Sequence, residues 1–317
     1  MTVREWVAHW QNTYDKPVSR PSTYAAHNDL FLNHILPQLG DIPLSELTER
    51  VVGDFLEERR RFGGHRPESP NYPGLGRESL RHIQTLLRQV LNRAVEEGLL
   101  ETNPALPFYT QKPKQVSAHV LMPMEVELYL DAAERLGHRP MFLLELTTGL
   151  RPGELIALKW SDLDAESGIL TVAEERSLEN GKVNEYGSRT RQVQLMPDVV
   201  AQLKLEHEKH PNHPMMFVHP GTNKPYSINM ARLLHKHITK TAGIPHVRFV
   251  DLRHTCAVHA LQNGLDVREL ARMLGNTRLV VVRRSYENDV STEKPISTTN
   301  TESELNSMAG LDAFLGI

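Results

Sequence analysis

The sequence predicts a mainly α-helical protein with a small β-sheet, folded as two domains. First, apolar residues recur at helical spacing through most of the chain, most clearly over residues 78–100. Second, the runs 169–173 and 191–195 have the length and composition expected of strands. Third, a chain of 317 residues can supply two cores, and residues 109–120 between the two helical regions show no regular pattern. We therefore expect two domains joined by a linker.

The first predicted domain, residues 1–108, contains four helices. The first helix, over 2–14, has its apolar residues on one face, and the second, over 23–35, is expected to end before Pro37. Thr48 caps the third helix, which runs to Arg61. A loop rich in Pro and Gly precedes the long fourth helix over 78–100. The pattern is that of a small helical bundle.

The second predicted domain, residues 121–289, mixes helices with the two strands. Helices are expected over 123–136 and 140–148, and the hairpin between the strands has its tip at 177–188. Arg253 opens a helix that stops at Gly264, and a further helix follows over 267–274, capped by Asp266 and ended by Gly275. A last short run over 279–282 delivers Tyr286. This domain is α+β.

The tail, residues 290–317, divides into a Ser/Thr-rich tether and a short amphipathic helix over 304–317. It carries four acidic residues against one lysine, which accounts for the net charge of −3 of the whole chain. The remaining body is balanced in charge, which permits a basic face for nucleic acid.

The composition is that of an ordinary water-exposed protein, with 39% hydrophobic and 24% charged residues. We see no apolar run long enough for a membrane span and no secretory leader before the polar start. The single cysteine, Cys256, excludes an internal disulfide and fits a reducing compartment. We expect a cytoplasmic protein with no membrane partner.

Two motifs in the second domain carry the functional prediction. One is Leu252-Arg253-His254-Thr255, followed by His259, Leu274-Gly275 and a tyrosine, Tyr286, ten residues after Asn276. The other is the phrase 149–154, GLRPGE, which contains Arg151. Together these motifs resemble the tyrosine recombinases, the phage integrase family.

The first domain resembles the core-binding domain of the same family. The segments 21–24, 39–44 and 92–95, together with Asn103-Pro104, match the sequence pattern typical of that domain. The resemblance implies a SAM-like helical DNA-binding domain followed by a catalytic domain, as in integrases that have no arm-binding domain.

The resemblance also implies a chemistry that these residue types can perform. Tyr286 is the expected nucleophile, because a phenol keeps the DNA phosphate as an ester while the strand is open. Arg151 and Arg253 clamp the non-bridging oxygens of the attacked phosphate. The resemblance implies no metal ion and no nucleotide cofactor.

Three positions depart from the family pattern, and the residues that usually transfer protons are replaced there. Val250 stands where the family has a histidine, three residues before Arg253, and Asn276 stands where it has a histidine or tryptophan. The usual place of the hairpin lysine falls at Glu185, and Lys182 lies three residues earlier. The candidate catalytic residues are therefore Arg151, Lys182, Arg253, Asn276 and Tyr286.

The resemblance implies a double-stranded DNA recombination site as the partner. It also implies a homotetramer on two DNA sites, linked through the C-terminal tail, and an accessory DNA-bending or directionality protein. Two alternatives stay open. One is a DNA-binding relative with weak or no strand cleavage, which Val250 and Glu185 favour. The other is a type IB topoisomerase, which shares the chemistry but which the core-binding domain and the tail disfavour.

Overall fold

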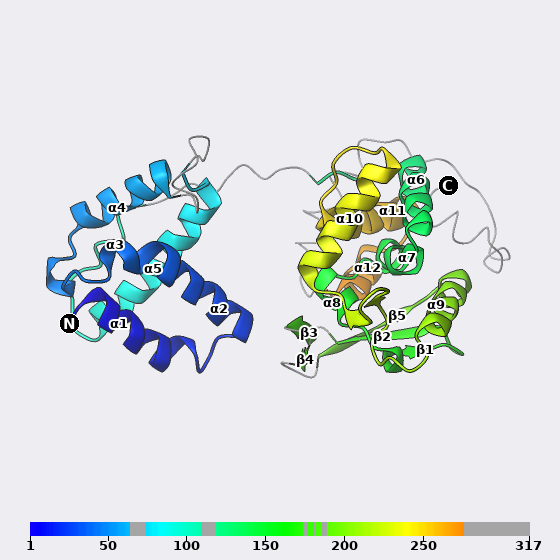
Figure 1. Ribbon diagram of the computed structural model, residues 1–317, viewed down its shortest axis with the longest axis horizontal. Helices are drawn as coiled ribbons and strands as arrows, with labels where there is room; N and C mark the ends of the chain where they lie inside the picture. The colour runs from blue at the N-terminus through cyan, green and yellow to red at the C-terminus, as the bar shows by residue number, and fades with distance from the viewer. Residues whose placement is uncertain (64–73, 109–117, 174–175, 180–181, 186–188, 276–317) are drawn as a thin grey trace. The chain divides into compact units, whose positions relative to one another are not determined.

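A computed structural model describes residues 1–63, 74–108, 118–173, 176–179, 182–185 and 189–275. The chain forms two compact units, Met1–Val116 and Ser117–Ile317 (Figure 1). Unit 1 is helical throughout its described residues, and unit 2 combines helices with small antiparallel sheets. The predicted fold class is confirmed. Within the described ranges, no helix is both long enough and apolar enough to cross a membrane.

Unit 1 is a bundle of short helices packed on one long helix. Its helices are α1 (Val3–Trp10), α2 (Pro21–Leu30), α3 (Leu36–Leu39), α4 (Glu49–Phe62) and α5 (Arg77–Glu96). Helix α5 packs against α1 and α4 and buries the apolar face that the sequence predicts. The indole N–H of Trp6 donates to the carbonyl of Val90, which ties α1 to α5 inside the core.

The sequence predicted that the second helix ends before Pro37, but the chain remains helical through this residue. A wide π-type turn over Phe31–Ile35 follows α2, and α3 then contains Pro37 within its first turn. Proline is tolerated there because the first N–H groups of a helix have no intrahelical acceptor. The expected helix end was therefore wrong by about one turn.

Unit 2 is built around α7 (Arg139–Thr148), whose residues from Pro140 to Thr148 are all buried. Helices α6 (Pro123–Arg135), α9 (Pro197–Lys209) and α11 (Phe249–Gln262) pack against it, and α8 (Pro152–Ile156) follows it directly. Helix α10 (Ile228–Ala242) packs on α6, and α12 (Val267–Leu274) follows α11 (Figure 1). A helix that is apolar on nearly all sides must be central.

The main sheet of unit 2 has the antiparallel strand order β1-β2-β5. These strands are β1 (Leu163–Asp164), β2 (Ile169–Ala173) and β5 (Thr190–Gln194), with Ile169 opposite Gln194. The segment expected to be only a hairpin tip contains a ladder of its own, β3 (Arg176–Glu179) and β4 (Lys182–Glu185). A third pair is formed by β6 (Val218–His219) and β7 (Lys224–Pro225).

Helix α11 begins at Phe249, one turn earlier than the expected start at Arg253. The Asp251 carboxylate accepts a hydrogen bond from the backbone N–H of Arg248, which caps the helix at that point. Arg253 consequently lies in the second turn of α11, inside the unit. Helices α9 and α10 were not predicted from the sequence.

Candidate active site

Arg151 is positioned by a sharp turn between α7 and α8. Gly149 ends α7 in the left-handed conformation (φ +60°), and Arg151 then adopts an extended conformation as the N-cap of α8. Its guanidinium Nη1 donates to Glu154 Oε1 at 2.7 Å, and its backbone N–H donates to Oε2 at 2.8 Å. The Arg151 side chain is 45% exposed, so the turn leaves it accessible to solvent.

Arg253 approaches the same turn from α11 and is almost completely buried. Its Nη1 donates to the carbonyl of Gly149 at 2.6 Å, and its Nη2 donates to the carbonyl of Leu274 at 2.7 Å. Both carbonyls lie at helix C-termini, where orphan acceptors and the helix dipole favour a cation. The two predicted arginines are thus brought together, because the carbonyl held by Arg253 lies two residues before Arg151.

A third arginine, Arg191 on β5, completes the cluster and was not among the predicted site residues. Its guanidinium binds the Glu154 carboxylate through two parallel hydrogen bonds of 2.9 and 2.8 Å, and its Nε donates to the carbonyl of Met273. Burial alone would raise the pKa of Glu154, but the hydrogen bonds and charge of Arg191 hold it below its usual value. The clue in the sequence was Arg191's position on the same strand face as the buried Val193.

The hairpin β3–β4 lies beside this cluster, because β3 packs against α8. Lys182 stands opposite Glu179 at the turn end of the ladder, and Glu185 stands opposite Arg176 at the other end. The departure at Val250 falls in the first turn of α11, one turn before Arg253, with the Val250 side chain 51% exposed. Asn276, Tyr286 and the tail 290–317 lie outside the described residues.

Gly149 gives the first testable prediction. A Cβ at this position would lie 2.5 Å from Cδ2 of Leu274 and 3.3 Å from Sγ of Cys256. We expect Gly149→Ala to destabilise the protein by about 1–2 kcal/mol for the left-handed backbone and by about 1–3 kcal/mol for overpacking. Chemical denaturation measures this loss. Gly137→Ala is the matched control, because Gly137 is also left-handed but has open space around it, so only the backbone cost should appear.

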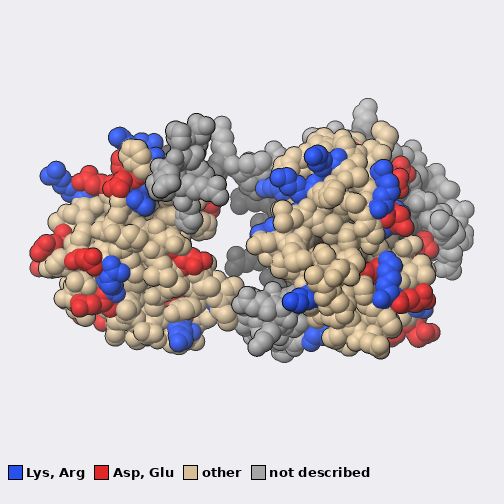
Figure 2. Space-filling model, in the orientation of Figure 1, with Lys and Arg blue, Asp and Glu red and all other residues tan. Residues whose placement is uncertain are grey.

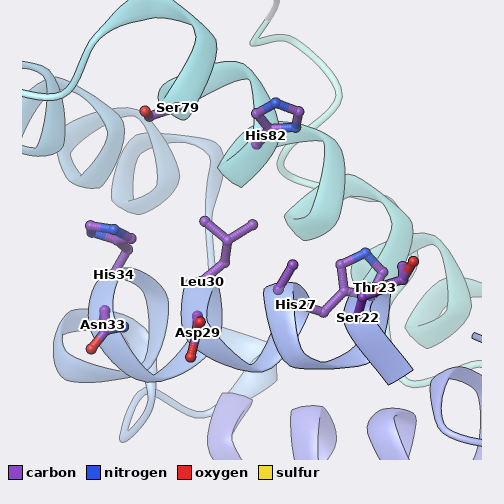
Figure 3. A pocket seen from close by; sticks show the side chains of 10 residues that line it. Ser22, Thr23, His27, Asp29, Leu30, Asn33, His34, Ser79 and His82 are labelled. Atoms are coloured by element: carbon purple, nitrogen blue, oxygen red, sulfur yellow. The ribbon is translucent and has the colours of Figure 1, made fainter. Parts of the chain in front are cut away.

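Unit 1 contains a second candidate region, a pocket of about 640 Å³ between α5 and the segment formed by α2 and the turn after it. Figure 3 shows His27, Leu30 and His34 pointing from the lower helix toward Ser79 and His82 on α5. The remaining lining residues are Ser22, Thr23, Ala26, Asp29 and Asn33. The pocket therefore offers hydroxyl, amide, imidazole and carboxylate groups, and its lining contains no lysine or arginine.

Helix α2 is unusually exposed for an element of a small bundle. None of its ten residues is fully buried, although the π-type turn after it buries Phe31 and Ile35. His27 is fixed from behind by the buried Asp15, whose carboxylate oxygens lie 3.0 and 3.1 Å from His27 Nδ1. Helix α2 therefore lies at the surface of unit 1.

Charges on the visible face of both units are dispersed. Figure 2 shows lysines and arginines interspersed with acidic residues and separated by wide uncharged areas on the described surface. Among the described residues, no group of His, Cys, Asp and Glu side chains has an arrangement that could hold a metal ion.

The helical first unit and the α+β second unit define a two-domain class of protein, and comparison with family models identifies that class. Residues 119–292 match the model of the phage integrase family, and residues 2–58 match the phage integrase N-terminal SAM-like domain. The chain belongs to the phage integrase family of tyrosine recombinases.

Individual relatives are distant but extend over most of the chain. The XerC-like tyrosine recombinase of Caldanaerobacter subterraneus subsp. tengcongensis is 26% identical over 74% of this chain and 67% of its own length. The integrase of Mycobacterium phage D29 is 28% identical over 87% of this chain and 72% of its own length.

Solved structures share the fold at low sequence identity. Lambda integrase in a dimer bound to a COC' core site covers 96% of this chain and 81% of its own, with TM-score 0.69 and 17% identity. The Tn1549 transposon integrase in complex with transposon right end DNA covers 92% of this chain and 98% of its own, with TM-score 0.72 and 16% identity.

Proposed function

We propose that the protein is a site-specific DNA recombinase that cuts and rejoins DNA through a 3'-phosphotyrosyl intermediate on Tyr286. The observation that carries the proposal is the meeting of Arg151 and Arg253 at the turn between α7 and α8, in a member of the phage integrase family. Arg253 on α11 donates to the carbonyl of Gly149, two residues before Arg151, and we expect both arginines to bind one phosphate group at this turn.

The two arginines differ in exposure, and the difference suits different tasks. The half-exposed Arg151 side chain is accessible to an incoming phosphate, and Glu154, itself held by Arg191, fixes its direction. The buried Arg253 has a position fixed by two carbonyls and supplies charge in a site of low dielectric. Such preorganised charge favours the transition state, in which negative charge gathers on the non-bridging oxygens.

The covalent step follows from the residue types. The Tyr286 hydroxyl loses its proton to water as its oxygen attacks the phosphorus, the bond to the 5'-oxygen of the next nucleotide breaks, and the phosphate remains esterified to the tyrosine. The departing 5'-oxygen needs a proton, and we assign Lys182 of the hairpin as its donor. Asn276 contributes a hydrogen bond to the phosphate. Rejoining runs the same exchange with a 5'-hydroxyl from the partner strand, without a cofactor.

Unit 1 is proposed to read the DNA through α2 and the adjoining pocket. The major groove of a duplex admits one α-helix, and α2 is a helix without a buried residue. The pocket offers Ser, Thr, Asn and His side chains and the Asp29 carboxylate, which are suited to base edges rather than to phosphates. We therefore expect each unit to contribute contacts to the double-stranded recombination site.

The tetramer on two DNA sites, with its tail-mediated contacts between protomers, belongs to the same proposal. The structures of lambda integrase include a tetramer bound to a Holliday junction, which supports that assembly for a protein of this fold. An accessory DNA-bending or directionality protein and a cytoplasmic location complete the proposal.

The deciding experiment uses duplexes that the full chain selects from a random-sequence pool. Each selected duplex is then nicked near its centre, so that a cleaved strand loses its end and cannot be rejoined. A protein–DNA band that survives denaturing electrophoresis is the expected result. Binding of the selected duplex without such a band would replace the proposal by the alternative.

The alternative is a DNA-binding recombinase relative with weak or no cleavage. Val250 favours it, since an exposed valine one turn before Arg253 can neither donate nor accept a proton where the family has histidine. Val250→His is then expected to raise the rate of covalent attachment if proton transfer limits it.

A further inference from the structure

Glu145 is a buried carboxyl group that the proposed chemistry does not use. It lies in the middle of α7 and is 0% exposed, and neither of its carboxylate oxygens has a hydrogen-bond partner among the residues that the structure describes. An unpaired buried carboxylate is among the most costly groups a core can contain. A leucine in its place would satisfy the surrounding apolar helix, so the presence of glutamate calls for a reason.

The position of Glu145 connects it with Arg253. The carbonyl of Glu145 accepts the backbone N–H of Gly149 at 2.8 Å, and the carbonyl of Gly149 accepts Nη1 of Arg253. Glu145 thus lies one helical turn below the anchor of the buried guanidinium, on a helix that packs directly against α11. Burial raises the pKa of the Glu145 carboxyl well above its usual range, and the Arg253 charge acts in the opposite direction.

The other groups that act on Glu145, or lie on the elements packed against α7, are neutral or already paired. Tyr129 on α6 and Cys256 on α11 are both buried, and burial raises the pKa of the Cys256 thiol to about 12. Of the carboxylates on the neighbouring elements, Glu206 on α9 is bound by Lys209 and Glu154 on α8 is bound by Arg191. Among the described residues facing α7, Arg253 is therefore the charge with which an ionised Glu145 would interact.

We infer that Glu145 is a proton-linked positioning residue for Arg253, whose carboxylate competes with the DNA phosphate for the guanidinium. When Glu145 is ionised, its negative charge attracts the Arg253 guanidinium from inside the core and partly neutralises the guanidinium's effect on a phosphate. When a phosphate binds, a proton from water transfers to a Glu145 oxygen, and the full guanidinium charge is directed at the phosphate. Phosphate binding and ionisation of Glu145 oppose each other by linkage. This inference rests on the proposed function.

The sign of the effect distinguishes it from the chemistry of Tyr286. Rising pH ionises Glu145 and weakens phosphate binding, whereas rising pH helps a phenol lose its proton and speeds attack. We therefore test DNA affinity in the Tyr286→Phe background, where attack cannot occur. The probe is the duplex that the full chain selects from a random-sequence pool. The working range is about pH 7.5–9.5, above the titration of histidines and below that of free tyrosine and lysine.

The expected result is a fall in affinity across that range of about tenfold, which corresponds to one pKa unit of coupling. Adding Glu145→Gln should abolish the fall, since an amide of the same shape cannot ionise. The salt dependence should change as well: the loss of one phosphate contact lowers the slope of log affinity against log salt by about 0.9 at high pH, but not with Glu145→Gln. Glu206→Gln, the matched control at a buried paired carboxylate, should keep the fall.

An unchanged fall in the Glu145→Gln protein would overturn the inference and leave the proposed function standing. If no duplex is selected by the full chain, the proposed function fails, and the inference fails with it. If Glu145→Gln does not fold, carbon-13 titration of the glutamate carboxyls in the Tyr286→Phe protein decides. One carboxyl pKa must rise on adding the duplex, and a set of unchanged values would overturn the inference.

Discussion

Replacing Tyr286 by phenylalanine is expected to abolish covalent attachment to DNA while leaving DNA binding intact. The variant lacks only the hydroxyl that forms the ester, so attachment should fall by a factor on the order of 10⁶, the scale seen when a covalent nucleophile is removed. The affinity for the selected duplex should change by about twofold or less, as for a substitution that leaves the folded contacts in place. The nicked duplex on a denaturing gel measures attachment, and a gel-shift titration measures affinity.

Tyr226→Phe is the matched control for this prediction. Tyr226 is a buried tyrosine of the same unit, so its substitution removes one hydroxyl without touching the arginine cluster. The control should retain the covalent band. A band that persists in Tyr286→Phe would reject Tyr286 as the nucleophile, and a lost band in both variants would point to a general loss of the fold.

The second large effect is expected at the buried pair of Arg191 and Glu154. Arg191→Met leaves the Glu154 carboxylate buried without its bidentate partner, and breaking a buried pair in this way costs about 3–5 kcal/mol. Glu154→Leu should cost a similar amount, because it strands the guanidinium. The double variant should recover most of the loss, since apolar residues of similar volume replace a buried ion pair at little cost.

Stability and activity should then separate in the double variant. Its unfolding free energy, measured in urea, should approach that of the unchanged protein. Covalent attachment should stay low, because Arg151 has lost the carboxylate that orients it. If the double variant were as unstable as either single variant, the two side chains would not be acting as a pair. Recovery of full attachment would show that Glu154 does not position Arg151.

Local patterns in the sequence were sufficient for most elements and for two of the site residues. The period of apolar residues predicted α5, and Thr48 and Asp266 do accept backbone N–H groups as N-caps. Arg151 and Arg253 were predicted from short motifs, and they converge at the turn between α7 and α8. The catalytic roles of Arg151, Lys182, Arg253, Asn276 and Tyr286 all remain predictions.

Other features depend on contacts between distant segments, and local sequence patterns did not predict them. Arg191 joins α8 and α12 from a strand, through partners 37 and 82 residues away. Helix α2 was predicted as a helix, but its near-complete exposure depends on how the rest of unit 1 packs. Pro37 was expected to end a helix, yet a wide turn and a new first turn accommodate it.

The sequence by itself determined the family and the mainly helical class, because helical period, capping and motif spacing are local properties. Only the tertiary structure decided that Arg253 is held by the carbonyls of Gly149 and Leu274, that Arg191 buttresses Glu154, and that Glu145 is buried without a partner. The physical reason is that burial and pairing depend on which segments meet in space, and a buried charge depends entirely on its neighbours.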